Sequence, residues 1–127
     1  MVPEHQNYQV RLSKFFAEHG VTAEMEKDFV DVSFSLGDED FIGEIKVTRN
    51  LTLSQAFRAA LGQLLDYSYV RSGKPPQMVM FLDQPLDQPR LKLASLLKIA
   101  VVVSEDERFL LMNPDDATSP LRTIFDV

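Results

Sequence analysis

The stretch from Asp28 to Thr48, DFVDVSFSLGDEDFIGEIKVT, decides the fold of this chain. It predicts two β-strands joined by an acidic turn at 37–40. Side chains alternate between the two faces of a strand, so Glu44 and Lys46 project from the same side of the second strand. On the first strand, Asp31 lies opposite an apolar row formed by Val30, Val32, Phe34 and Leu36. If the polar faces of the two strands coincide, one surface carries Asp31, Glu44 and Lys46 together.

This combination of side chains has a chemical use. Two carboxylates and an ammonium group on a rigid sheet can hold a divalent cation and stabilise negative charge on a phosphate. A simpler explanation stays open, because the solvent-facing side of a sheet often carries charges. The pattern Asp31 with Glu44-Ile45-Lys46 therefore does not decide between the two by itself.

Composition excludes several other classes of site. With 127 residues, 45% of them hydrophobic, we expect one domain spanning residues 1–127. The chain has no cysteine, which rules out disulfides and thiolate metal sites, and its two histidines are too few for a histidine-rich zinc centre. No apolar run approaches the roughly 20 residues that span a membrane, and no signal-peptide pattern is present. We therefore expect a cytoplasmic protein with no membrane partner.

The net charge of -6 argues against a surface built for nonspecific DNA binding, which usually has a basic excess. A nucleic-acid enzyme is still compatible with this charge, because a metal-binding pocket is itself acidic and its cation reverses the local field.

The remaining elements follow from apolar periodicity and from helix and turn signals. Helices are predicted at 3–19, from Thr52 or Ser54 to about Arg71, and at 86–98; further strands are predicted at 77–82, 99–104 and 109–112. Small residues of the second helix, Gly62 among them, are expected to face the sheet. The tail from Asn113 is expected to pack loosely. The predicted order is α-β-β-α-β-α-β-β, an α/β fold with a mixed β-sheet flanked by helices.

Over roughly residues 4–112 the chain resembles the PD-(D/E)XK, or restriction-endonuclease-like, nuclease superfamily. Asp31 matches the hairpin aspartate of that family, and Glu44-Ile45-Lys46 matches its Glu-X-Lys triplet. The helical segment ALGQLLDY at 60–67 resembles the family segment that carries a glutamine, here Gln63. One departure is visible, because Val30 precedes Asp31 where the family pattern has proline.

The resemblance implies a restriction-endonuclease-like core and hydrolysis of phosphodiester bonds in nucleic acid, with DNA as the expected substrate. It implies Mg²⁺ or Mn²⁺ held by Asp31 and Glu44, with Glu4 of the first helix as a further metal ligand. Lys46 would stabilise charge on the phosphate. For Glu4 a second explanation stands, because an acidic residue also favours a helix N-terminus through the helix dipole.

Four further residues complete the predicted site. Gln63 is the expected catalytic glutamine, which would orient the attacking water or contact the substrate; an ordinary solvent-facing role is the alternative. Arg49, Arg58 and Tyr67 are the expected nucleic-acid contacts. His5 is expected to be a surface or helix-cap residue.

Two other functional classes stay open. The first is a catalytically silent nuclease-fold interaction module in a nucleic-acid-processing or defence complex. The second is an unrelated α/β binding protein whose hairpin charges are structural. We also expect a homodimer, or a component of a larger complex, in which exposed Leu121, Ile124 and Phe125 supply part of the contact. The alternative for these three residues is that they cover the core of a monomer.

Overall fold

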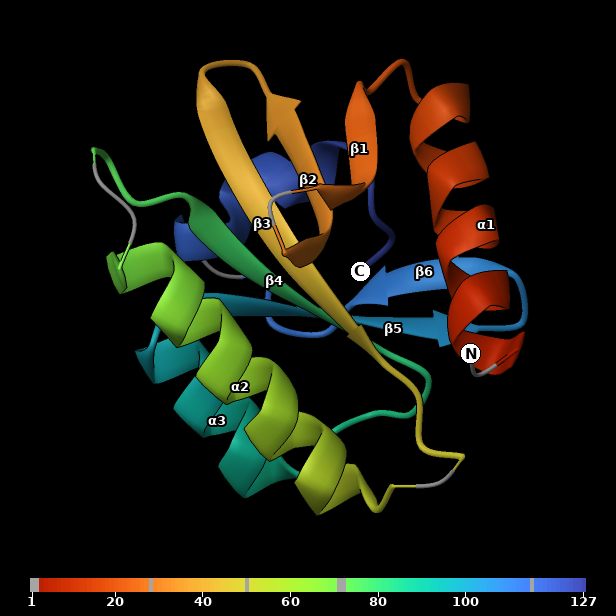
Figure 1. Cartoon of the computed structure of the whole chain (residues 1–127), viewed down its shortest axis with the longest axis vertical. Helices are drawn as coiled ribbons and strands as arrows, with labels where there is room; N and C mark the ends of the chain where they lie inside the picture. The colour runs from red at the N-terminus through yellow and green to blue at the C-terminus, as the bar shows by residue number, and fades with distance from the viewer. Residues whose placement is uncertain (1–2, 28, 50, 71–72, 115) are drawn as a thin grey trace.

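The computed structural model describes residues 3–27, 29–49, 51–70, 73–114 and 116–127. Figure 1 shows a twisted sheet with helices on both of its faces. In chain order the elements are α1 (Pro3–Glu18), β1 (Ala23–Lys27), β2 (Val30–Leu36), β3 (Glu39–Lys46), α2 (Leu53–Val70), β4 (Gln77–Leu82), α3 (Gln88–Leu96), β5 (Ile99–Glu105), β6 (Arg108–Leu111) and the 3-10 helix η1 (Asp116–Thr123).

Within the described ranges, six strands form one open mixed sheet in the order β1-β2-β3-β4-β5-β6. The pairs β1–β2, β2–β3 and β5–β6 are antiparallel, whereas β3, β4 and β5 run parallel to one another. Parallel neighbours need a crossover connection, and α2 and α3 supply the two crossovers. Right-handed crossovers that progress in one direction along a sheet place both helices on the same face.

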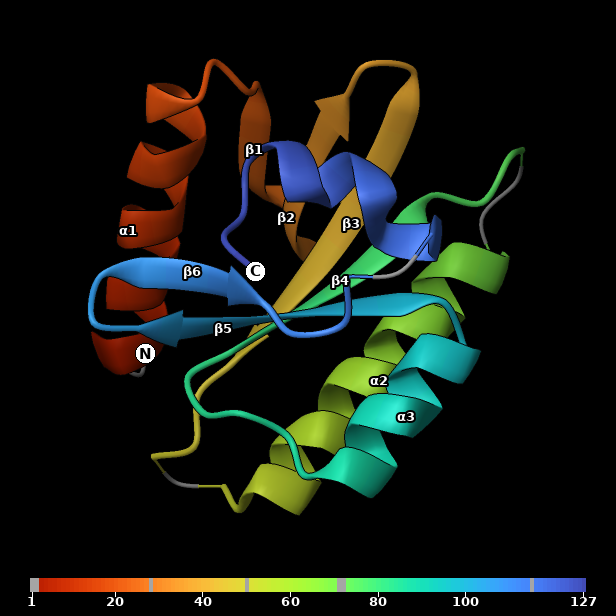
Figure 2. The same cartoon turned by 180° about the vertical axis from the view of Figure 1, so that it is seen from behind.

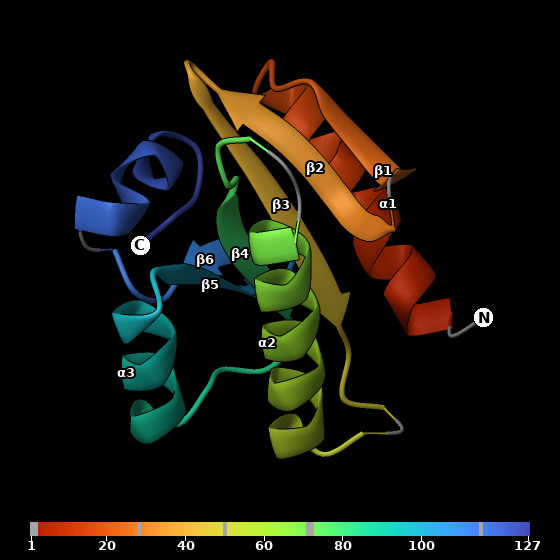
Figure 3. The same ribbon diagram turned by 60° about the vertical axis from the view of Figure 1, so that its left-hand side comes forward.

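The helices therefore form two outer layers. Helices α2 and α3 lie side by side over one face, as Figure 3 shows, and α1 lies over the other face. Seen from behind in Figure 2, η1 and the C-terminal segment lie on the same face as α1 and cover the part of it that α1 leaves open. The core is correspondingly divided into a cluster around Phe16, Phe41 and Phe81 on the α1 side and a cluster around Leu64 and Met80 on the α2 side.

The central strands β4 and β5 are covered on both faces. Residues 78–82 and 99–103 are all buried, which explains why these segments are continuous apolar runs and not alternating ones. The predicted strand at 77–82 is confirmed residue for residue, and the predicted strand at 99–104 extends one residue further.

The predicted element order was wrong in one respect, because strand β1 precedes the hairpin. Its sequence, AEMEK, is rich in residues with low strand propensity, and its side chains alternate between half-buried and exposed positions. As an edge strand it pairs only with β2, and its charged side chains discourage pairing with other chains. The hairpin turn is also shorter than predicted, since Glu39 and Asp40 already belong to β3.

The expectation that the tail from Asn113 packs loosely was wrong. The buried Asn113 side chain accepts a hydrogen bond from the Val101 N–H at 2.8 Å and donates one to the Ile99 carbonyl at 2.9 Å. Leu121 and Phe125 are buried in the α1-side cluster, and Ile124 packs against it. These apolar residues complete the core, so the predicted exposed dimer contact at Leu121, Ile124 and Phe125 is contradicted.

The two glycines of the predicted motifs have opposite surroundings. A Cβ atom at Gly43 would lie 2.5 Å from the Phe81 ring and 2.7 Å from a Val32 methyl group, so this position of β3 requires glycine. A Cβ atom at Gly62 would meet nothing within 4 Å, and Gly62 is exposed. The expectation that Gly62 faces the sheet was therefore wrong.

Helix α2 begins as predicted, with Thr52 as its cap. The Thr52 hydroxyl accepts from the Gln55 N–H at 3.1 Å, while the Gln55 side chain accepts from the Thr52 N–H at 2.9 Å. The helix ends at Val70, and the predicted end at Arg71 lies outside the described residues.

Candidate functional site

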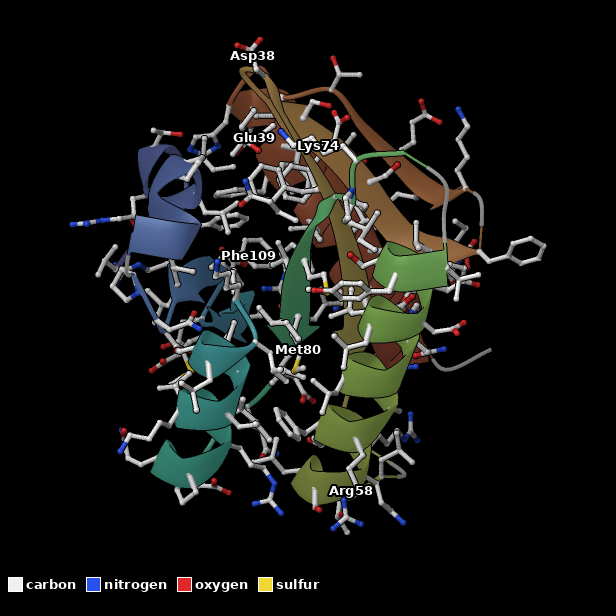
Figure 4. All side chains as sticks on the ribbon, turned by 90° about the vertical axis from the view of Figure 1, so that its left-hand side faces the viewer. Asp38, Glu39, Arg58, Lys74, Met80 and Phe109 are labelled. Atoms are coloured by element: carbon white, nitrogen blue, oxygen red, sulfur yellow. The ribbon has the colours of Figure 1, made fainter. Side chains whose placement is uncertain are left out.

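The β2–β3 register brings Asp31 and Glu44 together. Val32 pairs with Gly43 and Ser33 with Ile42, so the next residues along the ladder are Asp31 and Glu44. Glu44 is also the neighbour of Met80 on β4, and Met80 belongs to the α2-side cluster. Figure 4 shows Met80 between the sheet and the two helices. Strand alternation thus places the two carboxyl groups on one face of the sheet, as the side-chain pattern predicted. The structure shows that this is the face covered by α2.

The Asp31 carboxylate is held by donors from two elements. Its Oδ2 atom accepts a hydrogen bond from the Ile45 N–H at 2.8 Å, and His5 Nε2 of α1 lies 3.4 Å from the same oxygen. Burial raises the pKa of Asp31, but hydrogen bonds from His5, Glu44 and the Ile45 N–H outweigh burial, so the net shift is downward. Asp31 is therefore the ionised member of the pair.

Glu44 is buried, and its carboxyl group lacks a full set of hydrogen-bond partners. Its side chain is hydrogen-bonded to Asp31, but its Oε1 atom has no hydrogen-bond partner, and the residue is only 2% exposed. Burial raises the pKa of Glu44 to about 8, with further contributions from the hydrogen bond to Asp31 and from the charge of Asp31; nearby Lys46 opposes the shift. At neutral pH, Glu44 consequently carries the proton that lies between the two carboxyl groups.

His5 is a member of the site that the sequence reasoning missed. The hydrogen bond to Asp31 raises the pKa of His5, which favours an imidazolium that donates to the carboxylate. The only sequence feature that could have indicated this role of His5 is its position next to Glu4, the predicted metal ligand of the first helix. Nothing in the local sequence says which of these two neighbours points to the hairpin.

Glu4 has a different partner from the one predicted. Its Oε1 atom lies 2.5 Å from Arg49 Nη1, and the hydrogen bond from Arg49 lowers the pKa of Glu4. Both side chains are about half exposed. Among the described residues, no group of three or more His, Asp and Glu side chains is placed to hold a metal ion. The structure thus brings Asp31 and Glu44 together and leaves Glu4 with Arg49.

The predicted residues of α2 are distributed along the helix. Tyr67 is half-buried, and its pKa is raised first by burial and then by the nearby charge of Glu44. Gln63 is exposed one turn earlier on the same side of the helix. Arg58 lies near the start of α2 in Figure 4, about 13 Å from Tyr67 along the helix axis. It lines a groove between α2 and α3 together with Asp87 and Arg90, away from the carboxyl pair.

The donor set suits a hard divalent cation. Mg²⁺ is usually held by one or two carboxylates, with waters and substrate oxygens completing its shell. A cation beside the unpartnered Oε1 atom of Glu44 would compensate both carboxylates and remove the need for the shared proton. Asp31 and Glu44 therefore fit Mg²⁺ or Mn²⁺, and Lys46 lies close enough to act electrostatically on the same position.

No protein-family model, curated protein or solved structure matches the chain. No described helix combines the length and apolar character needed to cross a bilayer. The carboxyl pair and its surroundings are therefore the basis for assigning a function.

Proposed function

We propose that the protein is a metal-dependent nuclease with a restriction-endonuclease-like core that hydrolyses phosphodiester bonds, with DNA as substrate. The observation that carries the proposal is the buried Glu44, which is hydrogen-bonded to Asp31 and has an unpartnered Oε1 atom. A buried carboxyl group next to an ionised, partly exposed one is costly to keep without a cation. Such an arrangement is expected where a metal ion binds.

The side chains have distinct roles in this proposal. Bound Mg²⁺ or Mn²⁺ would polarise the scissile phosphate and lower the pKa of a water molecule. Asp31 is already ionised and oriented by the Ile45 N–H, so it is ready to act as a ligand. Glu44 must release its proton to become the second ligand.

Lys46 supplies positive charge without being a ligand. Its ammonium group would stabilise the negative charge that develops on the phosphoryl oxygens during attack. Tyr67 of α2 lies near enough to interact electrostatically with Glu44 and would contact the substrate. Gln63, one turn earlier on the helix, would orient the attacking water. Arg49 would contact a neighbouring phosphate after exchanging its present partner, Glu4.

A second candidate function is a catalytically silent interaction module. The position of His5 favours it, because an imidazolium on Asp31 Oδ2 already neutralises the ionised carboxylate. The pairing of Glu4 with Arg49 favours it as well, since this pairing engages one predicted ligand and one predicted phosphate contact. In this case the carboxyl pair would be a structural remnant with no need for metal.

Metal binding distinguishes the two candidates. Calorimetry with Mn²⁺ should show binding to the wild type and none to the Asp31→Asn, Glu44→Gln double variant. A matched control is the Glu105→Gln, Asp106→Asn variant, which removes two exposed acidic groups at the β5–β6 turn. Equal heat from all three proteins would count against the nuclease.

Activity is tested by incubating the protein with single- and double-stranded DNA and RNA in Mg²⁺ and in Mn²⁺. The wild type should cleave DNA. Lys46→Ala should abolish cleavage and keep metal binding, whereas Lys92→Ala, a change at an exposed lysine of α3, should leave both unchanged. A folded, metal-loaded wild type that cleaves none of the substrates would support the silent module.

A further inference from the structure

No other element of the described part of the chain lies over the outward face of α2. Its sheet-facing residues are Ala56, Phe57, Ala60, Leu64 and Ser68, all buried. A helix turns by about 100° per residue, which places Arg58, Gly62, Asp66 and Tyr69 on the opposite side. All four are exposed, and Figure 3 shows no other element in front of this face.

Gly62 lies at the centre of that face and approaches no other described segment of the chain closely. Glycine in the middle of a helix costs about 1 kcal/mol relative to alanine. At Gly62 this cost is not explained by a close approach, because nothing lies within 4 Å of the position of a Cβ atom. A helix surface without a side chain allows a second backbone to come close, and no described segment of this chain occupies the opening.

The charges on either side of Gly62 have opposite signs, so they can pair with those of a second copy of α2. Arg58 precedes Gly62 by four residues and Asp66 follows it by four. Neither forms an ion pair with another described residue. If two copies of α2 pack antiparallel around a two-fold axis at Gly62, each Arg58 comes level with the Asp66 of the other copy. A parallel arrangement would instead place like charges beside each other.

Apolar surface extends the same face. Tyr69 and Val70 at the end of α2 are 71% and 76% exposed. In the antiparallel arrangement, the Tyr69 ring lies over the first turn of the other α2. Aromatic rings with a polar edge are enriched at protein interfaces, because they bury a large area at low entropic cost.

From these observations we propose that the chain forms a homodimer through α2, with the two helices antiparallel and the two-fold axis at Gly62. The contact is isologous, so each Arg58–Asp66 pair occurs twice. Gln63 and Tyr67 lie about a quarter turn or more around the helix and stay outside the contact. The inference does not depend on the nuclease proposal, and it assigns Arg58 to the subunit contact in place of a phosphate.

Charge reversal tests the arrangement by sedimentation velocity and light scattering at micromolar concentration. The wild type should be a dimer. Arg58→Asp and Asp66→Arg, tested separately, should each weaken dimerisation at least about tenfold through four like charges around the axis. An equimolar mixture of the two variants should dimerise again, because each contact then joins opposite charges. Arg122→Asp, which makes the same change of charge at an exposed position near the C-terminus, should not affect the dimer.

A cross-link tests the position of the axis. The chain contains no cysteine, so Gly62→Cys introduces a single thiol at the two-fold axis. Mild oxidation should convert this variant to a disulfide-linked dimer, whereas Ser13→Cys on the exposed side of α1 should stay largely monomeric. The proposal is overturned by a monomeric wild type, by a mixture that does not reassociate, or by equal cross-linking at positions 62 and 13.

Discussion

At the scale of single residues, Glu44 links the stability of the hairpin to pH. Its carboxyl group has a pKa of about 8 in the folded protein against 4.5 for the ordinary group. The folded state therefore binds more protons than the unfolded state between these values. The contribution of Glu44 protonation to the free energy of unfolding is fully present below about pH 4.5. It falls as the pH rises through this window and is lost above about pH 8.

Replacing Glu44 by Gln should remove that loss, because an amide keeps a hydrogen bond to Asp31 and cannot ionise. In the absence of divalent metal, we expect the free energy of unfolding of Glu44→Gln to exceed that of the wild type at pH 9 by on the order of 2–4 kcal/mol. The difference should shrink towards pH 5. Urea unfolding at pH 5, 7 and 9 measures it, with Glu105→Gln as the control. Parallel pH profiles for wild type and Glu44→Gln would refute the buried, protonated Glu44.

The two glycines provide a second test at this scale. Gly43→Ala should destabilise the fold by about 1–3 kcal/mol, because the added methyl group meets Phe81 and Val32, both of which are fully buried. Gly62→Ala is the matched control. At a concentration where the chain is monomeric, it should stabilise the fold by about 1 kcal/mol. Equal effects of the two changes in urea unfolding would contradict the packing described for β3.

At the scale of elements, Asn113 connects the end of β6 to β5 and α3. Its side chain satisfies the Val101 N–H and the Ile99 carbonyl and donates to the Ser95 hydroxyl at 3.0 Å. Asn113→Ala should cost about 2–3 kcal/mol, because two backbone groups of a buried strand lose their partner. Asn7→Ala, a change at an exposed position of α1, should be close to neutral. Thermal unfolding of both variants provides the comparison, and similar melting temperatures would argue against this connection.

Elements with strong local signals could be predicted from the sequence. The cap at Thr52 and the apolar face of α2 predicted that helix, and the continuous apolar runs predicted β4 and β5. Strand β1 could not be predicted in the same way, because a short polar segment becomes a strand only through pairing with β2. The tail was missed for a similar reason: the burial of Leu121 and Phe125 depends on the α1-side cluster, which is distant in sequence.

The candidate site was predictable to the extent that strand geometry determines it. Alternation and the hairpin register were sufficient to bring Asp31 and Glu44 together. The pairings of His5 with Asp31 and of Glu4 with Arg49 depend on how α1 packs, and no local pattern encodes that packing. The roles of Lys46, Gln63, Arg49 and Tyr67 stay predictions.

At the scale of the whole molecule, a net charge of -6 gives no general attraction for nucleic acid. Binding of DNA should therefore require the divalent cation that neutralises Asp31 and Glu44. Lys46→Ala, which should not cleave, allows binding to be measured alone by fluorescence anisotropy. We expect its affinity for DNA to fall at least about tenfold when EDTA replaces Mg²⁺. Equal affinity in both buffers would show that the acidic pair takes no part in binding.

The central claim is that Asp31 and Glu44 form a metal site. Anomalous diffraction from a crystal soaked in Mn²⁺ tests it most directly, because the method locates the ion independently of activity. We predict a peak within about 2.0–2.6 Å of carboxylate oxygens of both residues, with water completing the shell. A fully soaked crystal in which Glu44 stays hydrogen-bonded to Asp31 and no peak lies beside the pair would contradict the account.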